Sequence, residues 1–180
     1  MSLLVCAGDA FLFLLLWEIM TLASYFLVIS NRHGHDTVKA GALYVVMAHA
    51  GTAFIIFAVL FLYDKSGSFD FAALRTAAQA LPEDSRTWLF AAFLVGFGTK
   101  AGLMPLHVWL PYAHPAAPSH VSALMSGVML KTAVYGVLRI GIGIVGAGGI
   151  PESWGWIVLG LGTSSAVLGI LYALQEHDLK

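Results

Sequence analysis

Ionisable residues lie deep inside apolar stretches of this sequence, where a charge is costly. Glu18, His49, Lys100 and Lys131 each stand near the middle of a run long enough to cross a membrane. A charge at the centre of such a helix costs roughly 2.5–3.5 kcal/mol on insertion scales, and a lysine at that depth cannot fully reach the interface. Because buried carboxylates, lysines and histidines in series form proton relays, we expect these residues to form a path for protons.

The combination of a carboxylate and a lysine suggests how such a path would work. A lysine taken out of water holds its proton less firmly, and a nearby carboxylate strengthens that hold. Movement of Glu18, or a change in its charge, would therefore make Lys100 release and regain a proton. The competing interpretation is a buried ion pair that only holds the helices together. It leaves Lys131 unexplained, since the sequence has no second carboxylate in the middle of a span.

Histidines supply further candidate steps, because imidazole titrates near neutral pH and exchanges protons at both of its nitrogens. His49 lies in the second apolar run, while His107 and His120 lie on either side of a loop between the third and fourth runs. No histidine pair has the i, i+4 spacing with a carboxylate that marks a helical zinc site, so we expect no metal site. Nucleotide-binding, nucleophile and haem-attachment motifs are absent from the sequence, and we expect no catalytic residues.

The composition indicates that membrane-spanning helices position these residues. Of the 180 residues, 59% are hydrophobic and only 11% are charged. Soluble domains carry roughly a quarter charged residues, so this chain is suited to a lipid bilayer. The apolar runs are continuous, whereas the strands of a membrane β-barrel alternate. The net charge of −1 leaves no basic surface for nucleic acid.

About five runs are long enough to cross the bilayer as helices of roughly 20 residues. We therefore predict a single all-α integral membrane domain over residues 1–180. Its spans are expected at about 10–30, 38–63, 88–110, 119–145 and 154–174. Residues 64–87 are expected to form a polar loop, either with a helix at the membrane interface or without regular structure. The positive charges are evenly divided between the two sides, so charge alone does not orient the chain.

The third span contains its own helix breakers. Gly102 weakens the helix, Pro105 removes a backbone hydrogen bond, and Pro111 is expected to end the span. A broken helix at membrane depth is tolerated only where protein or water satisfies the freed backbone groups, and such breaks mark ion sites in transporters. The alternative is a packing kink without a function.

The run KAGLMPLHVWLPYAHPAAPSHVSALMSGVMLKTAVYG, which starts at Lys100, resembles the most distinctive segment of the antiporter-like membrane subunits. That family includes the proton-pumping subunits of respiratory complex I, the large subunits of multisubunit cation/proton antiporters and the membrane arms of group 4 hydrogenases. Its portion HPAAPSHVSALMSGVMLKT most resembles the hydrogenase-4 component B branch. WEIMTLASYFLV and MAHAGTAFIIF are similar to the two helices that precede the break.

The resemblance implies roles for individual residues. Glu18 matches the essential glutamate of the family, and Lys100 matches the pumping lysine of the broken helix. Lys131 matches the lysine that links one half-channel to the next, and His49 matches a polar position in the second helix. The loop from residue 32 to residue 39 and the C-terminus are implied to face the cytoplasm. The resemblance covers only the first of the family's two inverted repeats, each of about five helices.

The function implied is a proton-translocating subunit, or a fragment of one. It would belong to a hydrogenase-4, formate hydrogenlyase-type or NADH–quinone oxidoreductase-type complex in the inner or cell membrane. Iron–sulfur, flavin or nickel–iron centres would lie in partner subunits, both membrane and peripheral, and no cofactor is expected in this chain. Two alternatives stay open: a subunit of a multisubunit sodium/proton antiporter, and a structural membrane scaffold.

Overall fold

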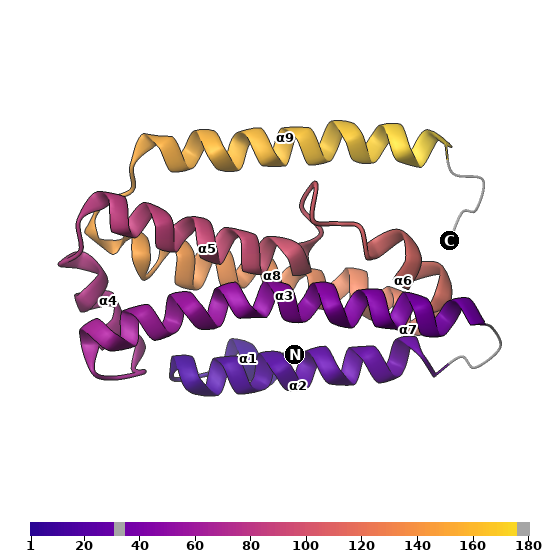
Figure 1. The fold of residues 1–180 in the computed structure, drawn as a ribbon, viewed down its shortest axis with the longest axis horizontal. Coiled ribbons are helices and arrows are strands. Elements are labelled where there is room, and N and C mark those ends of the chain that lie inside the picture. The colour runs from indigo at the N-terminus through magenta and orange to yellow at the C-terminus, as the bar shows by residue number, and fades with distance from the viewer. Residues whose placement is uncertain (31–34, 176–180) are drawn as a thin grey trace.

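The computed structural model of the chain describes residues 1–30 and 35–175. Within those residues the regular secondary structure is helical, apart from an isolated β-bridge between Asp9 and Asp70. The helices lie side by side along one long axis (Figure 1), and the predicted all-α fold is confirmed. Of the loop expected to face the cytoplasm, residues 32–34 lie outside the described part of the chain, as do residues 176–180. Residues 35–39 belong to a helix.

The first helices form a hairpin that provides one side of the bundle. The short α1 (Ser2–Val5) precedes α2 (Ala10–Val28), and α3 (His35–Ser66) runs back alongside α2 (Figure 1). Asp9 caps α2, because its side chain accepts a hydrogen bond of 2.7 Å from the Leu12 N–H. The cap therefore fixes the residue at which α2 begins, and with it which apolar side chains of α2 face the interior.

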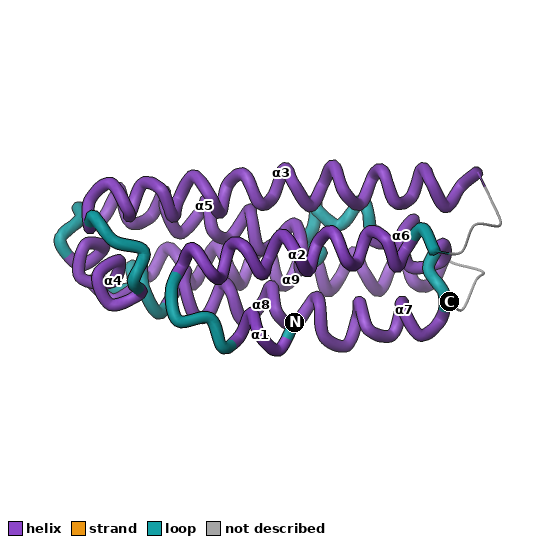
Figure 2. Tube along the Cα trace, turned by 90° about the horizontal axis from the view of Figure 1, so that it is seen from below, coloured by secondary structure: helices purple, strands orange, loops and turns teal. Residues whose placement is uncertain are grey.

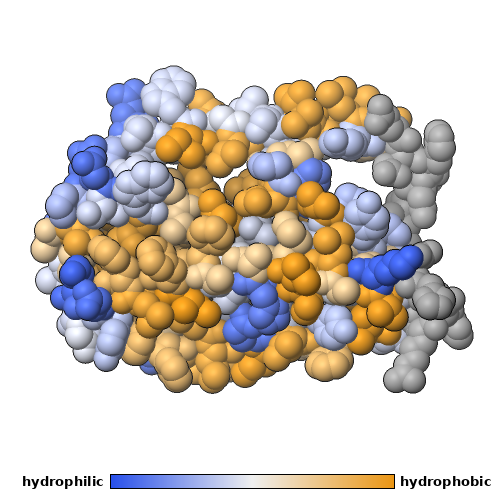
Figure 3. All heavy atoms as spheres, viewed as in Figure 1, coloured by the Kyte–Doolittle hydropathy of each residue, from blue (hydrophilic) through white to orange (hydrophobic). Residues whose placement is uncertain are grey.

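The polar segment expected at residues 64–87 is largely helical. α3 continues to Ser66, and α5 (Glu83–Ala101) already begins at Glu83. Between them lies α4 (Phe71–Gln79), which buries Leu74 and Ala78 against the end of the bundle. Figure 3 shows hydrophilic residues (blue) gathered at that end, whereas hydrophobic residues (orange) cover much of the side of the bundle.

The third span is broken after α5. Gly102 ends the helix with φ of +78°, a left-handed conformation that glycine adopts without a steric penalty. Residues 103–109 form a loop before α6 (Leu110–Ala116). We expected Pro111 to end the span, but it lies in the first turn of α6, where a missing N–H is not needed. The loop lies near the middle of the long axis, away from both ends (Figure 1, Figure 2).

The fourth span changes helix type along its length. It passes through α7 (Ser119–Leu124), the π-helical turn η1 (Met125–Met129), α8 (Leu130–Gly136), a second π-helical turn η2 (Val137–Ile142) and the 3-10 turn η3 (Val145–Gly148). Such π turns are frequent at functional sites.

Of the described helices, four are long and apolar enough to cross a membrane: Ala10–Val28, Thr37–Ser66, Ser119–Gly148 and Glu152–Leu174. Helix α5 is not one of them, since it carries charged residues at both ends and stops at Ala101. The expected third span of 88–110 is thus divided between α5 and the loop that follows.

Glycines bring α3 and α5 into backbone contact. A Cβ added at Gly51 would lie 2.9 Å from the carbonyl oxygen of Gly96, and one added at Gly96 would lie 2.8 Å from that of Gly51. Both positions therefore exclude any side chain. The contact brings together the part of α3 that carries His49 and the part of α5 that leads to Lys100.

The last helix, α9 (Glu152–Gln175), stands apart from the bundle (Figure 1). None of its membrane-length window is buried in this chain. Its start is attached through Trp154, whose ring stacks on Phe90 of α5 at 4.1 Å and whose Nε1 donates to Thr87 at 3.0 Å. Its middle is attached through Ser165, whose hydroxyl accepts a hydrogen bond from the Met104 N–H.

Candidate functional site

Lys100 lies in the last turn of α5 with only 2% of its surface exposed. Its Nζ donates hydrogen bonds to Thr21 Oγ1 of α2 at 2.7 Å and to the hydroxyl of Tyr44 on α3 at 3.0 Å. Residues from three helices therefore meet at one amine. The carbonyl dipoles at the end of α5 also favour a positive charge at this position.

Aromatic rings enclose the same amine. Nζ lies 5.5 Å from the ring centroid of Trp17 and 5.1 Å from that of Tyr44. Ring faces attract a cation, and the attraction is larger where water is excluded. Trp17 is itself fixed by a hydrogen bond of 3.1 Å from its Nε1 to Thr52 Oγ1. In the described part of the chain no carboxylate lies within ion-pair distance of Lys100, so neutral groups surround it.

Glu18 and His49 form the second part of the site. Glu18 Oε2 of α2 lies 3.3 Å from His49 Nε2 of α3, and the side chains are 30% and 49% exposed. The other ring nitrogen, Nδ1, lies 2.9 Å from the carbonyl oxygen of Val45. Since that carbonyl can only accept, Nδ1 carries a hydrogen, and Nε2 is the nitrogen that faces the Glu18 carboxylate.

Glu18 does not form a direct ion pair with Lys100. The carboxylate oxygen Oε1 of Glu18 is buried and has no hydrogen-bond partner in the structure. A buried polar atom without a partner is costly unless water or a moving group completes it. The carboxylate is therefore held by His49 on one side and left unsatisfied on the other.

The loop after the break is held by side-chain and backbone hydrogen bonds that replace those of the lost helix. Trp109 Nε1 donates to the carbonyl oxygen of Thr99 at 2.8 Å, and the Leu103 N–H donates to that of Gly98 at 2.9 Å. The Met104 N–H donates to Ser165 Oγ of α9 at 2.9 Å. Backbone groups freed by the break are thus satisfied by protein, as an irregular segment at membrane depth requires.

His107 lies in this loop and faces α9. Its ring centroid is 6.2 Å from that of Tyr172. Its Nδ1 is buried and has no hydrogen-bond partner. His107 therefore has an unsatisfied nitrogen that a water molecule or a proton donor could complete, but it does not contact Lys100.

Lys131 and His120 are not joined to the Lys100 cluster. Lys131 lies on α8 and His120 near the start of α7, and both side chains are exposed in this chain. Neither takes part in a hydrogen bond or an ion pair among the described residues. The structure thus gathers Glu18, His49 and Lys100 and leaves the remaining predicted path residues separate.

Sequence reasoning missed the neutral groups around Lys100, namely Thr21, Tyr44 and Trp17. All are almost fully buried. The spacing of Trp17 and Thr21 was an available signal, because residues i and i+4 share a helix face and this face also holds a polar hydroxyl. Tyr44 gave no such signal, since a tyrosine in an apolar helix is as common at a membrane interface as in a core.

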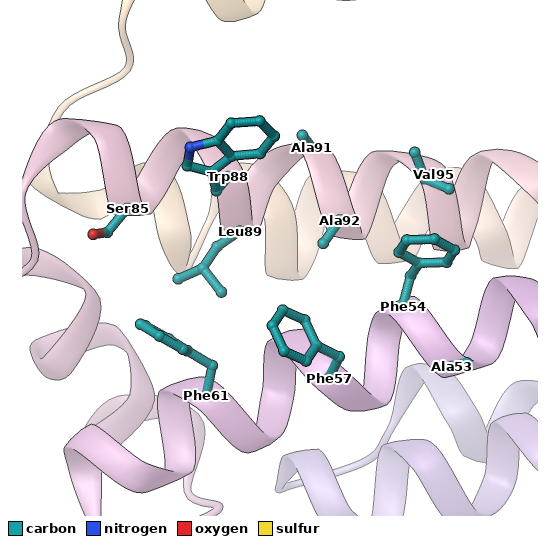
Figure 4. Close-up of a pocket in the computed structure, with 10 residues that line it drawn as sticks. All are labelled: Ala53, Phe54, Phe57, Phe61, Ser85, Trp88, Leu89, Ala91, Ala92 and Val95. Atoms are coloured by element: carbon teal, nitrogen blue, oxygen red, sulfur yellow. The ribbon is translucent and has the colours of Figure 1, made fainter.

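A groove between α3 and α5 lies apart from these residues. Aromatic and small side chains line it, among them Phe54, Phe57, Phe61, Trp88 and Ala92 (Figure 4). Apart from the hydroxyl of Ser85 and the indole N–H of Trp88, its lining side chains are apolar, so it offers no proton carrier. Among the described residues no group of three or more His, Cys, Asp or Glu side chains is placed to hold a metal ion, and the expected absence of a metal stays a prediction.

Residues 7–180 match the family model described as NADH:quinone oxidoreductase/Mrp antiporter, transmembrane. The chain is 48% identical to hydrogenase-4 component B of Escherichia coli (strain K12) over 180 residues, which are 100% of this chain and 26% of that protein. It is 36% identical to formate hydrogenlyase subunit 3 of the same organism over 176 residues, 98% of this chain and 27% of that protein.

The structural comparison agrees with the sequence comparison. The fold is similar to a chain of respiratory complex I from Thermus thermophilus with bound NADH, with a TM-score of 0.67 and 25% sequence identity. The match covers 79% of this chain and 30% of that one. The chain thus spans about a quarter of the length of the curated relatives described above.

Proposed function

Since the chain belongs to the NADH:quinone oxidoreductase/Mrp antiporter family of membrane proteins, we propose that it is a proton-translocating subunit, or part of one. The relatives named hydrogenase-4 component B and formate hydrogenlyase subunit 3 support a complex of the same type as its setting. Its other membrane and peripheral subunits would carry the redox centres, and the complex would lie in the inner or cell membrane.

The burial of Lys100 without a counter-charge is the observation that carries the proposal. A purely structural role does not explain a buried amine without a counter-charge, because burying a charge is costly unless it is closely paired. A lysine that changes its protonation state needs partners that suit both forms. The two hydroxyl acceptors meet this need, since an ammonium and a neutral amine can each donate two hydrogen bonds.

Glu18 and His49 supply the charge that drives the exchange. The 3.3 Å contact between Nε2 and Oε2 fits a pair that holds one proton between these atoms, because the Nδ1 hydrogen is used by Val45. When that proton leaves, Glu18 is ionised and His49 neutral, and the pair carries one negative charge, which favours the protonated form of Lys100. When the pair takes up a proton it becomes neutral, whichever residue holds that proton, and this support for the charge on Lys100 is lost. Lys100 then releases its proton, and electrostatic coupling takes the place of a direct ion pair.

The proposed path continues from Lys100 to Lys131, with His107 and His120 at the loop side. These residues are separated in the structure, so water or a change of conformation must connect them. The unsatisfied Nδ1 of His107 supports a bound water at that point.

The test uses the full-length polypeptide in its assembled complex, reconstituted in sealed vesicles with an electron donor. Glu18→Ala and Lys100→Ala are expected to abolish donor-driven proton translocation. Lys65→Ala is the matched control, because Lys65 is exposed at the end of α3 and pairs with Asp64 at 2.9 Å. Unchanged translocation in Lys100→Ala would refute the proposal.

The same vesicles separate the alternatives. If Lys100→Met assembles and translocates protons as the wild type does, the residue belongs to a structural scaffold. If proton flux depends on sodium and needs no electron donor, the chain belongs to an antiporter without a redox partner.

A further inference from the structure

The hydroxyl groups around Lys100 pass their own hydrogens to atoms that cannot carry a proton onward. Thr21 Oγ1 donates to the carbonyl oxygen of Trp17 at 2.9 Å. The Tyr44 hydroxyl donates to the thioether sulfur of Met129 at 3.5 Å. A carbonyl and a thioether accept hydrogen bonds but have no hydrogen of their own to pass on. Tyr44 also forms a side-chain hydrogen bond with the buried Ser24, whose own hydroxyl donates to the carbonyl oxygen of Met20 at 2.7 Å. In this conformation the hydrogen-bonded shell of Lys100 therefore ends at carbonyl oxygens and at a thioether.

Methionines also separate Tyr44 from the helix that carries Lys131. Met129 is fully buried and is the last residue of the π turn η1. Thr132, which directly follows Lys131, is buried and donates to the carbonyl oxygen of Met129 at 2.7 Å. The same hydroxyl lies 3.5 Å from the sulfur of Met20 on α2. Each hydroxyl on the side towards α8 thus meets a sulfur atom.

We propose that Met129 and Met20 form a thioether barrier that keeps the proton of Lys100 from reaching Lys131 until the helices rearrange. The inference rests on the proposed function, since a barrier matters only if Lys100 exchanges protons. A chain of hydroxyls conducts when each oxygen hands on one hydrogen while it receives another. A sulfur atom at the end of the chain stops this exchange, and its apolar surroundings exclude the water that would bypass it.

Such a barrier has a clear use in a proton-translocating subunit. A path that conducted at all times would dissipate the gradient, so at least one point must stay closed while Lys100 is loaded. Met129 is suited to this point because it contacts the hydroxyl that binds Lys100, yet it has no group that ionises. Met129 and Met20 act here as positioning residues, since they bind no proton themselves.

The experiment measures proton leak through the assembled complex in sealed vesicles without an electron donor. A pH gradient is imposed, and its decay is followed with a trapped pH-sensitive dye. Met129→Gln keeps a similar side-chain length but adds an amide that donates and accepts hydrogen bonds. We expect the leak to rise about tenfold, which corresponds to a barrier lower by about 1.4 kcal/mol. Adding Lys100→Met to Met129→Gln is expected to remove the extra leak.

Matched variants show whether the position matters. Met125→Gln places the same amide in the same π turn at a residue of similar burial, and among the described residues the Tyr44 hydroxyl donates to Met129 and not to Met125. Met129→Leu removes the sulfur without adding a polar group. Both are expected to leak no more than the wild type. A leak from Met125→Gln equal to that from Met129→Gln overturns the barrier.

Two further outcomes separate this inference from the proposed function. If donor-driven translocation depends on Lys100 but neither Met129→Gln nor Met20→Gln leaks, the barrier is overturned and the proposed function stands. If translocation does not depend on Lys100, both are overturned. Met20→Gln carries the leak test alone if Met129→Gln does not assemble.

Discussion

Glu18 on α2 faces His49 on α3, with 3.3 Å between Oε2 and Nε2. The opposite nitrogen of His49 is held at 2.9 Å from the carbonyl oxygen of Val45, so the ring has one nitrogen free to exchange a proton. Both side chains remain partly exposed in this chain, whereas Lys100 is enclosed. The pair therefore forms the accessible part of the site and Lys100 the enclosed part.

Replacing His49 tests whether the imidazole transfers a proton or only supports Glu18. His49→Gln can still contact the carboxylate but cannot take up a proton, and His49→Leu can do neither. We expect both variants to slow donor-driven proton uptake by on the order of 10²-fold, the contribution typical of a positioned acid–base group. Initial uptake rates per amount of assembled complex give the measurement. A rate near that of the wild type in His49→Gln would limit His49 to a packing role.

Removing one of the hydroxyls that bind Lys100 is expected to slow proton translocation while the replacing side chain keeps the same shape. Thr21→Val deletes the acceptor at 2.7 Å from Nζ, and a hydrogen bond to a charged group is worth about 1.5–3 kcal/mol. Proton uptake should fall about tenfold or more. Thr99→Val is the control, since Thr99 is similarly buried and its hydroxyl donates to the carbonyl oxygen of Val95 in its own helix. Equal losses in both variants would contradict a specific role for Thr21.

The left-handed glycine at the break is expected to be indispensable for stability. Gly102→Ala places a Cβ where φ is +78° and against the side chain of Leu110. The backbone term alone costs about 1–2 kcal/mol, so the apparent melting temperature of the purified complex should fall. Gly127→Ala meets no atom within 4 Å and is expected to leave the melting temperature at or above that of the wild type. A stable Gly102→Ala complex would show that the break tolerates another backbone conformation.

The bond between the break and α9 can be tested with neighbouring serines. Ser165→Ala leaves the partly buried Met104 N–H without its acceptor, which costs less than the roughly 1–3 kcal/mol of a fully buried donor. Amide exchange with deuterium in residues 103–109 should then accelerate by about tenfold. Ser164→Ala removes a hydroxyl that bonds within α9, to Leu161, and should leave the loop unchanged. Slow exchange in both variants would mean that other contacts hold the loop.

The helical membrane fold was predictable from the sequence, because continuous apolar runs report both helix type and length. The break after α5 was also predictable, since Gly102 weakens a helix and Pro105 lacks the N–H that would continue its hydrogen bonds. The role of Pro111 was not, because the same proline that ends one helix also suits the first turn of the next. Whether Pro111 ends one helix or begins the next depends on the path of the loop before it, and the sequence alone does not give that path.

The sequence indicated which ionisable residues belong to the site more readily than how they are arranged. Sequence hydropathy places Glu18, His49 and Lys100 at similar depths but gives no rotation of one helix about another. That rotation brings His49 towards Glu18 and turns Lys131 outward. Neutral hydroxyls such as those of Thr21 and Tyr44 barely change the hydropathy of a span, so the shell around Lys100 emerges only from packing.

The backbone contact between Gly51 and Gly96 has a mechanical consequence. No side chain lies between the two main chains there, so no rotamer can absorb a shift and the crossing acts as a rigid pivot. His49 lies just before Gly51, and Lys100 lies about one turn beyond Gly96. Tilting of α3 against α5 in a thinner or thicker bilayer would swing the far ends of both helices widely. His49 and Lys100, which lie beside the pivot, would keep their depths in the membrane relative to each other.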